Sequence, residues 1–211
     1  ILTMTTAAGS GHPTSSLSAV ELMTVLSFKY LRYDLADPKN PANDRVIFSK
    51  GHASPLYYAL YAAAGVISAE ELSKYRTFDS VLEGHPTERF KYTEAATGSL
   101  GQGLSIGLGE TLALRMQKSP GRVFVLSGDG ELAEGSVWEA AAAASFRKVD
   151  NLFFLVDVNR LGQSDPTMYE HDLSVYQKRF EAFGWRVVTV EKGNDLEEVD
   201  KAFSHTFLQS L

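Results

Sequence analysis

Apolar and polar residues along the chain are grouped in two kinds of block. Short apolar runs bounded by Gly, Pro or Asn are typical of buried strands, and longer blocks rich in Ala and Leu are typical of helices. The short runs predict strands at 46–48, 123–126 and 152–157, and an alternating segment predicts a further strand at 185–191. The longer blocks predict helices at 16–33, 53–64, 101–118, 138–146, 172–183 and 195–211. A capping box at Ser68 and Glu71 predicts one more, short helix.

The order of these elements predicts the fold class. Strand 123–126, helix 138–146 and strand 152–157 form a βαβ unit, whose helical crossover makes the two strands parallel. Parallel sheets are covered by helices on both faces. We therefore expect an α/β protein with three layers, α/β/α, around a central and mainly parallel sheet. The sequence has no linker rich in Gly, Ser or Pro, so residues 1–211 are expected to form one domain.

Three glycines inside one predicted helix indicate close packing. Gly103, Gly107 and Gly109 all fall within 101–118, and a glycine in a helix interior costs about 1 kcal/mol relative to alanine. We expect either a backbone packed closely against this helix or a ligand beside it. The last predicted helix is expected to be capped by Asn194 or Asp195.

Composition narrows the classes of protein and partner. The 211 residues are 44% hydrophobic and carry a net charge of −6, which allows a substantial core. There is no basic run, so neither nucleic acid nor an anionic membrane surface is expected as a partner. No apolar stretch reaches the roughly 18 residues of a membrane span. The absence of cysteine excludes disulfides and thiolate metal sites, and it fits a cytoplasmic protein.

Both ends of the sequence fall within predicted helices. The chain begins at Ile1 without an initiator methionine, and the helix predicted from Asp195 continues to Leu211 without a tail. We therefore expect a fragment, or one subunit of a larger protein.

The most informative side chains follow the ends of two predicted strands. Gly128-Asp129-Gly130 ends the first strand, and Asn159 follows the second. Parallel strands bring their carboxyl ends to the same edge of the sheet, where ligands of open α/β sheets bind. Carboxylate and amide oxygens suit Mg²⁺, or Ca²⁺, rather than zinc, and Mg²⁺ commonly shares its shell with phosphates. The sequence therefore predicts a metal-bound diphosphate.

Acidic residues close to this pair have two interpretations. Glu131 and Glu134 follow Asp129 directly, where acids either favour a helix N-terminus or serve the site. Asp157, at the end of its strand, either supports the metal ligands or has a structural role.

Three histidines lie in similar settings. His12, His52 and His85 each follow a glycine at a predicted turn. Imidazoles there can donate hydrogen bonds to phosphate or hydroxyl oxygens, and they titrate near neutral pH. Any one of them alone also fits an ordinary turn. All three, taken with Asp129, are expected to line one cavity.

A glycine-rich segment, Thr97–Gly103, precedes the predicted helix 101–118. The free N–H groups of such an entry can hold an anion or a polar ring. The segment matches neither Gly-x-Gly-x-x-Gly after a strand nor the Walker A pattern with its lysine. That argues against a dinucleotide-dependent dehydrogenase and against a P-loop enzyme.

Taken together, these segments resemble the amino-terminal, diphosphate-binding domain of transketolase over almost the whole chain. The resemblance is carried by Thr5–Ser15, Asp44–Ala53, Gly84–Pro86, Ala96–Gly103, Gly128–Ala140 and Asp157–Pro166. Gly-Asp-Gly with the later Asn is the thiamine diphosphate signature, and it is specific only beside the other segments, which are present. Ser99 and the stretch Asn159–Ser164 are similar to the animal-type enzymes.

The resemblance implies a role for each matching residue. Mg²⁺ would be bound by the side chains of Asp129 and Asn159 and by the carbonyl group of Leu161. The residues implied to contact the cofactor are Ser15, His52, Gly98, Ser99, Leu100, Gly130 and Asn159. His12 and His85 would be catalytic, stabilising charge on the sugar, and Gln163 would also face the sugar. Glu134 would join an acidic network across a dimer, and Lys50 would lie near the phosphate end of the cavity.

The implied activity is that of a thiamine diphosphate-dependent transferase. It moves a two-carbon ketol unit reversibly from a ketose phosphate to an aldose phosphate in the pentose phosphate pathway. In the family, a pyrimidine-binding domain supplies the acid that activates the cofactor, and this domain and the C-terminal domain lie outside the 211 residues. We therefore expect a homodimer or a partner chain that carries the pyrimidine domain, with association through the helix that starts near Trp138.

Two alternatives stay open at this point. The chain could be a diphosphate-binding or assembly module without turnover, or part of a related ketol transferase such as dihydroxyacetone synthase. The complete set of histidines favours the enzyme.

Overall fold

Three parallel strands form the central sheet of the protein, whose structure, a computed structural model, is described for residues 1–208. They are β1 (Arg45–Phe48), β2 (Val123–Gly128) and β3 (Leu152–Asp157), in the order β1-β2-β3. Gly128 at the end of β2 is in register with Asp157 at the end of β3. The prediction of a parallel βαβ unit is therefore confirmed, and the two strands end side by side.

Helices and helical turns make up most of the remaining regular structure. Their bounds are α1 (Leu2–Ala8), α2 (Pro13–Leu17), α3 (Val20–Val25), the π-helical turn η1 (Leu26–Tyr30), the 3-10 turn η2 (Gly51–Ala53), α4 (Ser54–Ala63), α5 (Ala69–Leu72), α6 (Gln102–Met116), the 3-10 turn η3 (Asp129–Ala133), α7 (Gly135–Phe146), α8 (Leu173–Ala182) and α9 (Leu196–Leu208).

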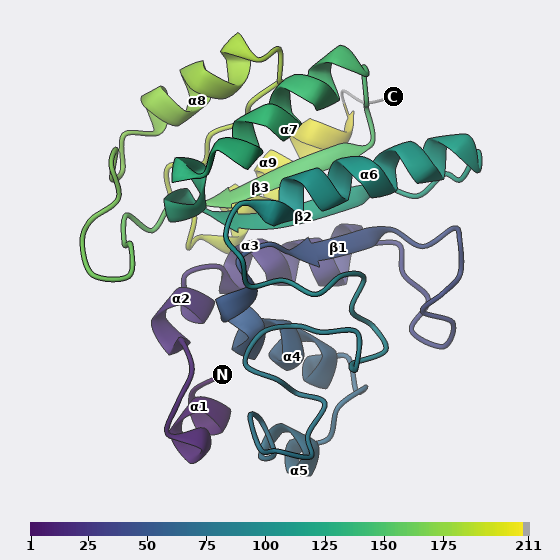
Figure 1. The fold of residues 1–211 in the computed structure, drawn as a ribbon, viewed down its shortest axis with the longest axis vertical. Helices are drawn as coiled ribbons and strands as arrows, with labels where there is room; N and C mark the ends of the chain where they lie inside the picture. Colours follow the sequence, from purple (N-terminus) through teal and green to yellow (C-terminus); the bar gives the residue numbers. More distant parts are fainter. Residues whose placement is uncertain (209–211) are drawn as a thin grey trace.

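Alternate residues of each strand face two separate cores, which define the three layers. On one face, Phe124 and Leu126 of β2 pack with residues of α3, α4 and α9. On the other face, Val123 and Val125 pack with residues of α6, α7 and α8. Figure 1 shows α6 and α7 along one face of the strands, with α4 and α5 beyond the β1 edge. The predicted α/β class is confirmed as a parallel sheet with helices on both faces.

The helix predicted at 16–33 is broken, so the prediction of one continuous helix is wrong. It is interrupted between α2 and α3, where Ala19 leaves the helical region with φ −106° and ψ 10°. The hydroxyl group of the preceding Ser18 is hydrogen-bonded to Asp157 at the end of β3, which draws this turn toward the sheet. After α3 the chain widens into the π-helical turn, closed by the bond from the Leu31 N–H to the Leu26 carbonyl group.

The strand predicted at 185–191 is also absent, because this segment has no regular structure in the chain. Trp185 at its start is held by helices instead of by β3. Its backbone N–H donates to the carbonyl group of Phe180, and its indole N–H donates to that of Ala141. The alternating pattern is real in the sequence, but the backbone pairing that would make it a strand does not form.

The helix caps agree with the sequence. The Ser68–Glu71 capping box is present in both directions. Of the two candidates for the last cap, Asp195 accepts hydrogen bonds from the N–H groups of Glu197 and Glu198. Residues 209–211 of the helix predicted at 195–211 lie outside the described part of the chain.

The glycines of α6 have different neighbours. A Cβ atom at Gly103 would lie 2.2 Å from the Cβ atom of Ser49, and one at Gly107 would lie 2.5 Å from Val125 Cγ2. Both glycines therefore let α6 pack directly on the sheet, as expected. A Cβ atom at Gly109 would meet nothing within 4 Å. Within residues 1–208, no helix has both the length and the apolar character needed to cross a membrane.

Candidate cofactor and metal site

Asp129 occupies the first position after β2 and is 4% exposed. Its Oδ2 atom accepts hydrogen bonds from the Arg160 N–H at 3.1 Å and from Thr167 Oγ1 at 2.5 Å. Its Oδ1 atom is buried and has no partner among residues 1–208. A buried carboxylate oxygen without a donor is costly to leave alone. This oxygen is therefore the one available to a cation.

Asn159 lies two residues past the end of β3, and the next residue, Arg160, donates its N–H to Asp129. Its Nδ2 atom donates to Ser18 Oγ at 3.3 Å and to Asp157 Oδ2 at 3.4 Å. Its Oδ1 atom accepts from the Leu161 N–H at 3.0 Å. Because the amide nitrogen faces a carboxylate, the amide oxygen is turned toward the loop that follows β3.

That loop folds back on itself in a short antiparallel turn. Leu161 forms an isolated bridge with Pro166, and the Gly162 N–H donates to the carbonyl group of Asp165. The Thr167 N–H donates to the carbonyl group of Arg160 at 2.8 Å. The turn therefore brings the Thr167 side chain back to Asp129. It leaves Leu161 62% exposed.

A buried ion pair supports the same strand end. Lys50, only 1% exposed, pairs with the carboxylate of Asp157. The hydroxyl group of Ser18 also contacts Asp157, and it lies 3.3 Å from both Lys50 Nζ and Asn159 Nδ2. Ser18 and Asp157 together fix the orientation of the Asn159 amide group by accepting hydrogen bonds from its nitrogen atom. These contacts favour the interpretation of Asp157 as a residue that supports a predicted metal ligand.

The three predicted histidines meet at the carboxyl side of the sheet. The rings of His12 and His52 contact each other edge to face, with centroids 5.2 Å apart. His85 packs on the glycine-rich segment, since a Cβ atom at Gly98 would lie 3.0 Å from His85 Cδ2. Gly98 has a φ of +140°, which favours glycine, and this lets the turn approach the imidazole.

The environment keeps two of these imidazoles neutral. Burial, aided by the charge of Lys50 and by the other two histidines, lowers the pKa of His52 to about 4. Burial lowers the pKa of His85 as well, and His12 and Arg76 act in the same direction. A neutral imidazole has one N–H donor and one acceptor nitrogen. Both histidines can therefore hydrogen-bond a ligand at neutral pH without adding a positive charge.

The other predicted site residues lie around this centre. Ser99 and Leu100 are exposed in the turn before α6, and Gly130 lies in η3, where a Cβ atom would meet only Thr167 Cγ2 at 3.7 Å. Ser15 is half-buried in α2, the helix that begins after His12. Gln163 is exposed at the tip of the 161–166 turn. Glu134 is exposed at the start of α7, where a Cβ atom at Gly101 would lie 2.5 Å from its Cβ atom.

These residues fit a magnesium–diphosphate group. The donor set is the carboxylate oxygen of Asp129 without a partner in the described chain, the amide oxygen of Asn159 and the carbonyl group of the exposed residue Leu161, all hard oxygen ligands. In the described chain, no three His, Cys, Asp or Glu side chains are grouped to hold a metal. The predicted set has only one such side chain, so the diphosphate would have to complete the coordination.

Thr167 and Ser18 were missed by the sequence reasoning. Both are short hydroxyl residues that reach the site from distant segments, 38 residues after Asp129 and 139 residues before Asp157. No local pattern marks either residue, because the folded loop and the helix break create the contact.

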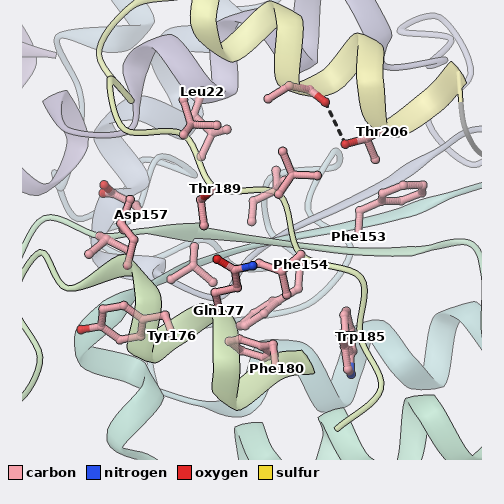
Figure 2. A pocket seen from close by; sticks show the side chains of 18 of the residues that line it. Leu22, Phe153, Phe154, Asp157, Tyr176, Gln177, Phe180, Trp185, Thr189 and Thr206 are labelled. Carbon is pink, nitrogen blue, oxygen red and sulfur yellow. Dashed lines mark hydrogen bonds between the residues drawn. The ribbon is translucent and has the colours of Figure 1, made fainter. Parts of the chain in front are cut away.

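A cavity of about 1020 Å³ lies beside the open edge of β3. Figure 2 shows Tyr176, Phe180 and Trp185 on one side of the strand and Leu22 and Thr206 on the other. Ser18, Asp157 and Asn159 belong both to this lining and to the candidate site, and they mark where the cavity borders the site. His12, His52 and His85 are not among the residues that line it.

Comparisons with known proteins agree with this geometry. The family model described as "Transketolase, thiamine diphosphate binding domain" matches residues 2–209. The chain is 54% identical to a transketolase of Pongo abelii over 200 residues, which are 94% of this chain and 32% of that protein. It thus spans about a third of the length of that relative.

A solved structure and a shorter relative add to the comparison. The crystal structure of transketolase from Campylobacter jejuni superposes with a TM-score of 0.86 at 34% identity, covering 96% of this chain and 33% of that one. The chain is also 39% identical to one subunit of the apulose-4-phosphate transketolase of Phocaeicola vulgatus, over 93% of this chain and 69% of that relative.

Proposed function

This chain belongs to the transketolase family through its thiamine diphosphate-binding domain, and we propose that it holds Mg²⁺ and the diphosphate end of that cofactor for ketol transfer. Residues 1–211 would act as one diphosphate-binding domain. The observation that carries the proposal is the buried Oδ1 atom of Asp129, which has no partner within residues 1–208. The cation would be bound there, by Asn159 Oδ1 and by the carbonyl group of Leu161.

Thiamine diphosphate supplies the nucleophilic carbon of this family's chemistry. The protein residues bind and orient the reactants. Gly130 would offer its backbone N–H to the diphosphate, and the Gly98–Leu100 turn, Ser15 and His52 would contact the cofactor. His52 suits this contact because its neutral ring both donates and accepts a hydrogen bond.

His12 and His85 are proposed to face the sugar phosphate together with Gln163. Preorganised imidazole N–H groups would stabilise negative charge as it develops on the substrate oxygens. The half-buried ring of His85 packs against Gly98, which supports a defined position of the imidazole before a sugar binds. The substrates proposed are a ketose phosphate as donor and an aldose phosphate as acceptor, in the pentose phosphate pathway and in the cytoplasm.

A second polypeptide segment is part of this proposal. Leu100 and Leu161 are 44% and 62% exposed beside the site, where a pyrimidine-binding domain would cover them. Glu134, exposed at the start of α7, would join an acidic network with a partner in a dimer. The relative from Phocaeicola vulgatus is named as one subunit of its transketolase and is matched over 69% of its length, which supports a chain that works beside a separate partner.

Binding of the cofactor is the first test. Titration calorimetry of the chain with thiamine diphosphate and Mg²⁺ should give saturable binding that Asp129→Asn abolishes or weakens at least tenfold. Asp165→Asn is the matched control, because Asp165 is exposed in the neighbouring turn. Equal binding by both variants would refute the metal assignment.

Turnover is the second test. The chain is mixed with a chain that carries the pyrimidine-binding domain of a transketolase, and ketol transfer is assayed. His12→Ala and His85→Ala should each lower turnover at least tenfold, or about 1.4 kcal/mol in activation free energy. Stable association without ketol transfer by the wild-type pair would instead indicate a binding module without turnover.

A further inference from the structure

The carboxylate of Glu131 lies at the junction of three turns that carry the proposed cofactor contacts. Glu131 is 1% exposed. Its Oε1 atom accepts hydrogen bonds from Ser49 Oγ at 2.7 Å and from the Gly101 N–H at 2.9 Å. Its Oε2 atom accepts from Ser127 Oγ at 3.0 Å and from the Gly128 N–H at 3.1 Å. One side chain therefore joins the ends of β1 and β2 to the entry of α6.

The four donors require a carboxylate in particular. Each oxygen faces one hydroxyl group, which can rotate, and one backbone N–H group, which cannot. A glutamine has one acceptor oxygen and one NH₂ group. In either orientation its NH₂ group would point at the N–H of Gly101 or of Gly128. A buried donor would then lose its partner, which is more costly than losing a hydrogen bond in water.

Each joined turn leads into a proposed cofactor residue. At the end of β1, Ser49 is followed closely by His52 in η2. At the end of β2, Gly128 is followed directly by Asp129. The third turn is Gly98–Leu100 itself. The residue that follows it, Gly101, donates its N–H to Glu131. Ser49 Oγ also accepts from the N–H of Gly103, which extends the connection into α6.

We propose that Glu131 is a positioning residue that sets the relative placement of these three turns for Mg²⁺ and thiamine diphosphate. The inference rests on the proposed function. Glu131 is buried behind the turns, so it acts through His52, Asp129 and the Gly98–Leu100 turn rather than by touching the cofactor. The carboxylate of Glu131 caps the turn η3 through the Gly128 N–H, and it also accepts from Ser49, Gly101 and Ser127, so it does more than stabilise a helix N-terminus.

The test compares Glu131→Gln with Glu88→Gln, an exposed glutamate outside the site. The dissociation constant of thiamine diphosphate with Mg²⁺ is measured by calorimetry, and the midpoint of urea unfolding is measured in parallel. Glu131→Gln should raise the dissociation constant at least tenfold, and Glu88→Gln should leave it unchanged. A Glu131→Gln protein that is less stable but binds the cofactor like the wild type would overturn the proposal.

Milder variants keep the test decisive if Glu131→Gln does not fold. Ser127→Ala removes one hydroxyl donor, whereas Ser49→Ala also leaves the Gly103 N–H without its acceptor. The loss of affinity should therefore be about twofold to threefold for Ser127→Ala and larger for Ser49→Ala. Equal affinities for both variants and the wild type would refute the inference.

Amide hydrogen exchange separates this inference from the proposed function. The Gly101 and Gly128 amides should exchange faster in Ser49→Ala and Ser127→Ala respectively, while the amides of Phe124 and Val125 in the middle of β2 stay protected. If the wild-type chain binds no thiamine diphosphate, the proposed function fails. Unchanged exchange at Gly101 and Gly128 would instead show that Glu131 does not hold these turns.

Discussion

Thr167 donates a hydrogen bond of 2.5 Å to Oδ2 of Asp129, whereas Oδ1 of the same carboxylate has no partner within residues 1–208. The contact spans the loop after β3, whose turn is closed by the bond from the Thr167 N–H to the carbonyl group of Arg160. Groups that orient a metal ligand in this way commonly govern metal affinity. The geometry of the predicted magnesium site therefore depends on a residue that is not itself a ligand.

Replacing this threonine gives the first prediction. Thr167→Val keeps the shape and removes the hydroxyl group, so Oδ2 of Asp129 keeps only the Arg160 N–H as a donor and the carboxylate is held less firmly in one orientation. Affinity for Mg²⁺ in the presence of thiamine diphosphate should fall about tenfold to a hundredfold. Thr167→Ser retains the hydroxyl group and should restore most of it. Calorimetric titration measures the effect, and equal losses in the two variants would contradict the role of the hydroxyl group.

The Lys50–Asp157 pair gives the second prediction. Lys50→Met leaves the buried charge of Asp157 without its cation, which is expected to lower the free energy of unfolding by about 3–5 kcal/mol. The exposed pair of Lys74 and Glu70 supplies the control, because Lys74→Met should cost less than about 1 kcal/mol. Urea denaturation measures both variants. Similar losses of unfolding free energy in the two variants would show that the buried pair stabilises the fold no more than the exposed pair does.

The double variant Lys50→Met/Asp157→Asn refines this experiment. Removing both charges at once avoids an uncompensated ion, so the double variant should be more stable than Lys50→Met alone. A double variant as unstable as the sum of the two single variants would argue that the partners act independently.

The elements that bring Asp129 and Asn159 together could be predicted from the sequence for a simple reason. Two apolar runs of strand length on either side of an Ala-rich helix commonly fold into two parallel neighbouring strands, whose carboxyl ends are adjacent. The register of Gly128 with Asp157 is the outcome. Gly103 and Gly107 could be interpreted similarly, because glycine inside a helix indicates close packing.

Other features depend on contacts that no local pattern encodes. Lys50 is buried because Asp157, 107 residues away, meets it in the fold. Glu131 had two equally good interpretations until its four donors were placed around it. The alternating segment 185–191 has the composition of a strand, but its position is set by bonds from Trp185 to α7 and α8. The pattern of apolar and polar residues alone cannot predict which of these long-range contacts will form.

The low pKa of His52 gives a prediction on pH. Burial lowers this pKa from its ordinary value of 6.5 to about 4. Between pH 4 and 6.5 the unfolded chain therefore binds a proton at His52 that the folded chain does not. Stability should fall as the pH drops through this range, by about 2 kcal/mol from His52 after allowance for solvent screening.

Nuclear magnetic resonance of the ring C–H signals can follow His52 directly. The signal should stay at its neutral position down to about pH 5, and His52→Asn should reduce the acid-side loss of stability. Titration of His52 near pH 6.5 in the folded chain would contradict the proposed environment.

Glu110 should change the stability in the opposite direction over nearly the same pH range. Burial and the nearby carboxylate of Glu94 raise its pKa from 4.5 to about 7, although Arg45 opposes this. The folded chain therefore holds a proton at Glu110 that the unfolded chain loses between pH 4.5 and 7. Stability should decrease across this interval, with the full penalty above pH 7.

A neutral side chain at this position removes the penalty. Glu110→Gln should be more stable than the wild type above pH 7, by about 1–2 kcal/mol after allowance for screening, and should gain nothing near pH 4. Urea denaturation at several pH values measures this, and Glu191→Gln, at an exposed position, is the control. A gain that does not vary with pH would point to a cause other than ionisation.

Two glycines of one helix should respond to the same substitution with opposite signs. A methyl group at Gly107 would lie 2.5 Å from Val125 Cγ2, and Val125 is fully buried in β2. Gly107→Ala therefore overpacks the core and should cost about 1–3 kcal/mol. A methyl group at Gly109 meets nothing within 4 Å, so Gly109→Ala should gain about 1 kcal/mol from helix propensity. Because both glycines lie in α6, their difference in unfolding free energy cancels the common helix term and reports the contact with β2. A gain of stability in both variants would show that α6 is not seated on the sheet as described.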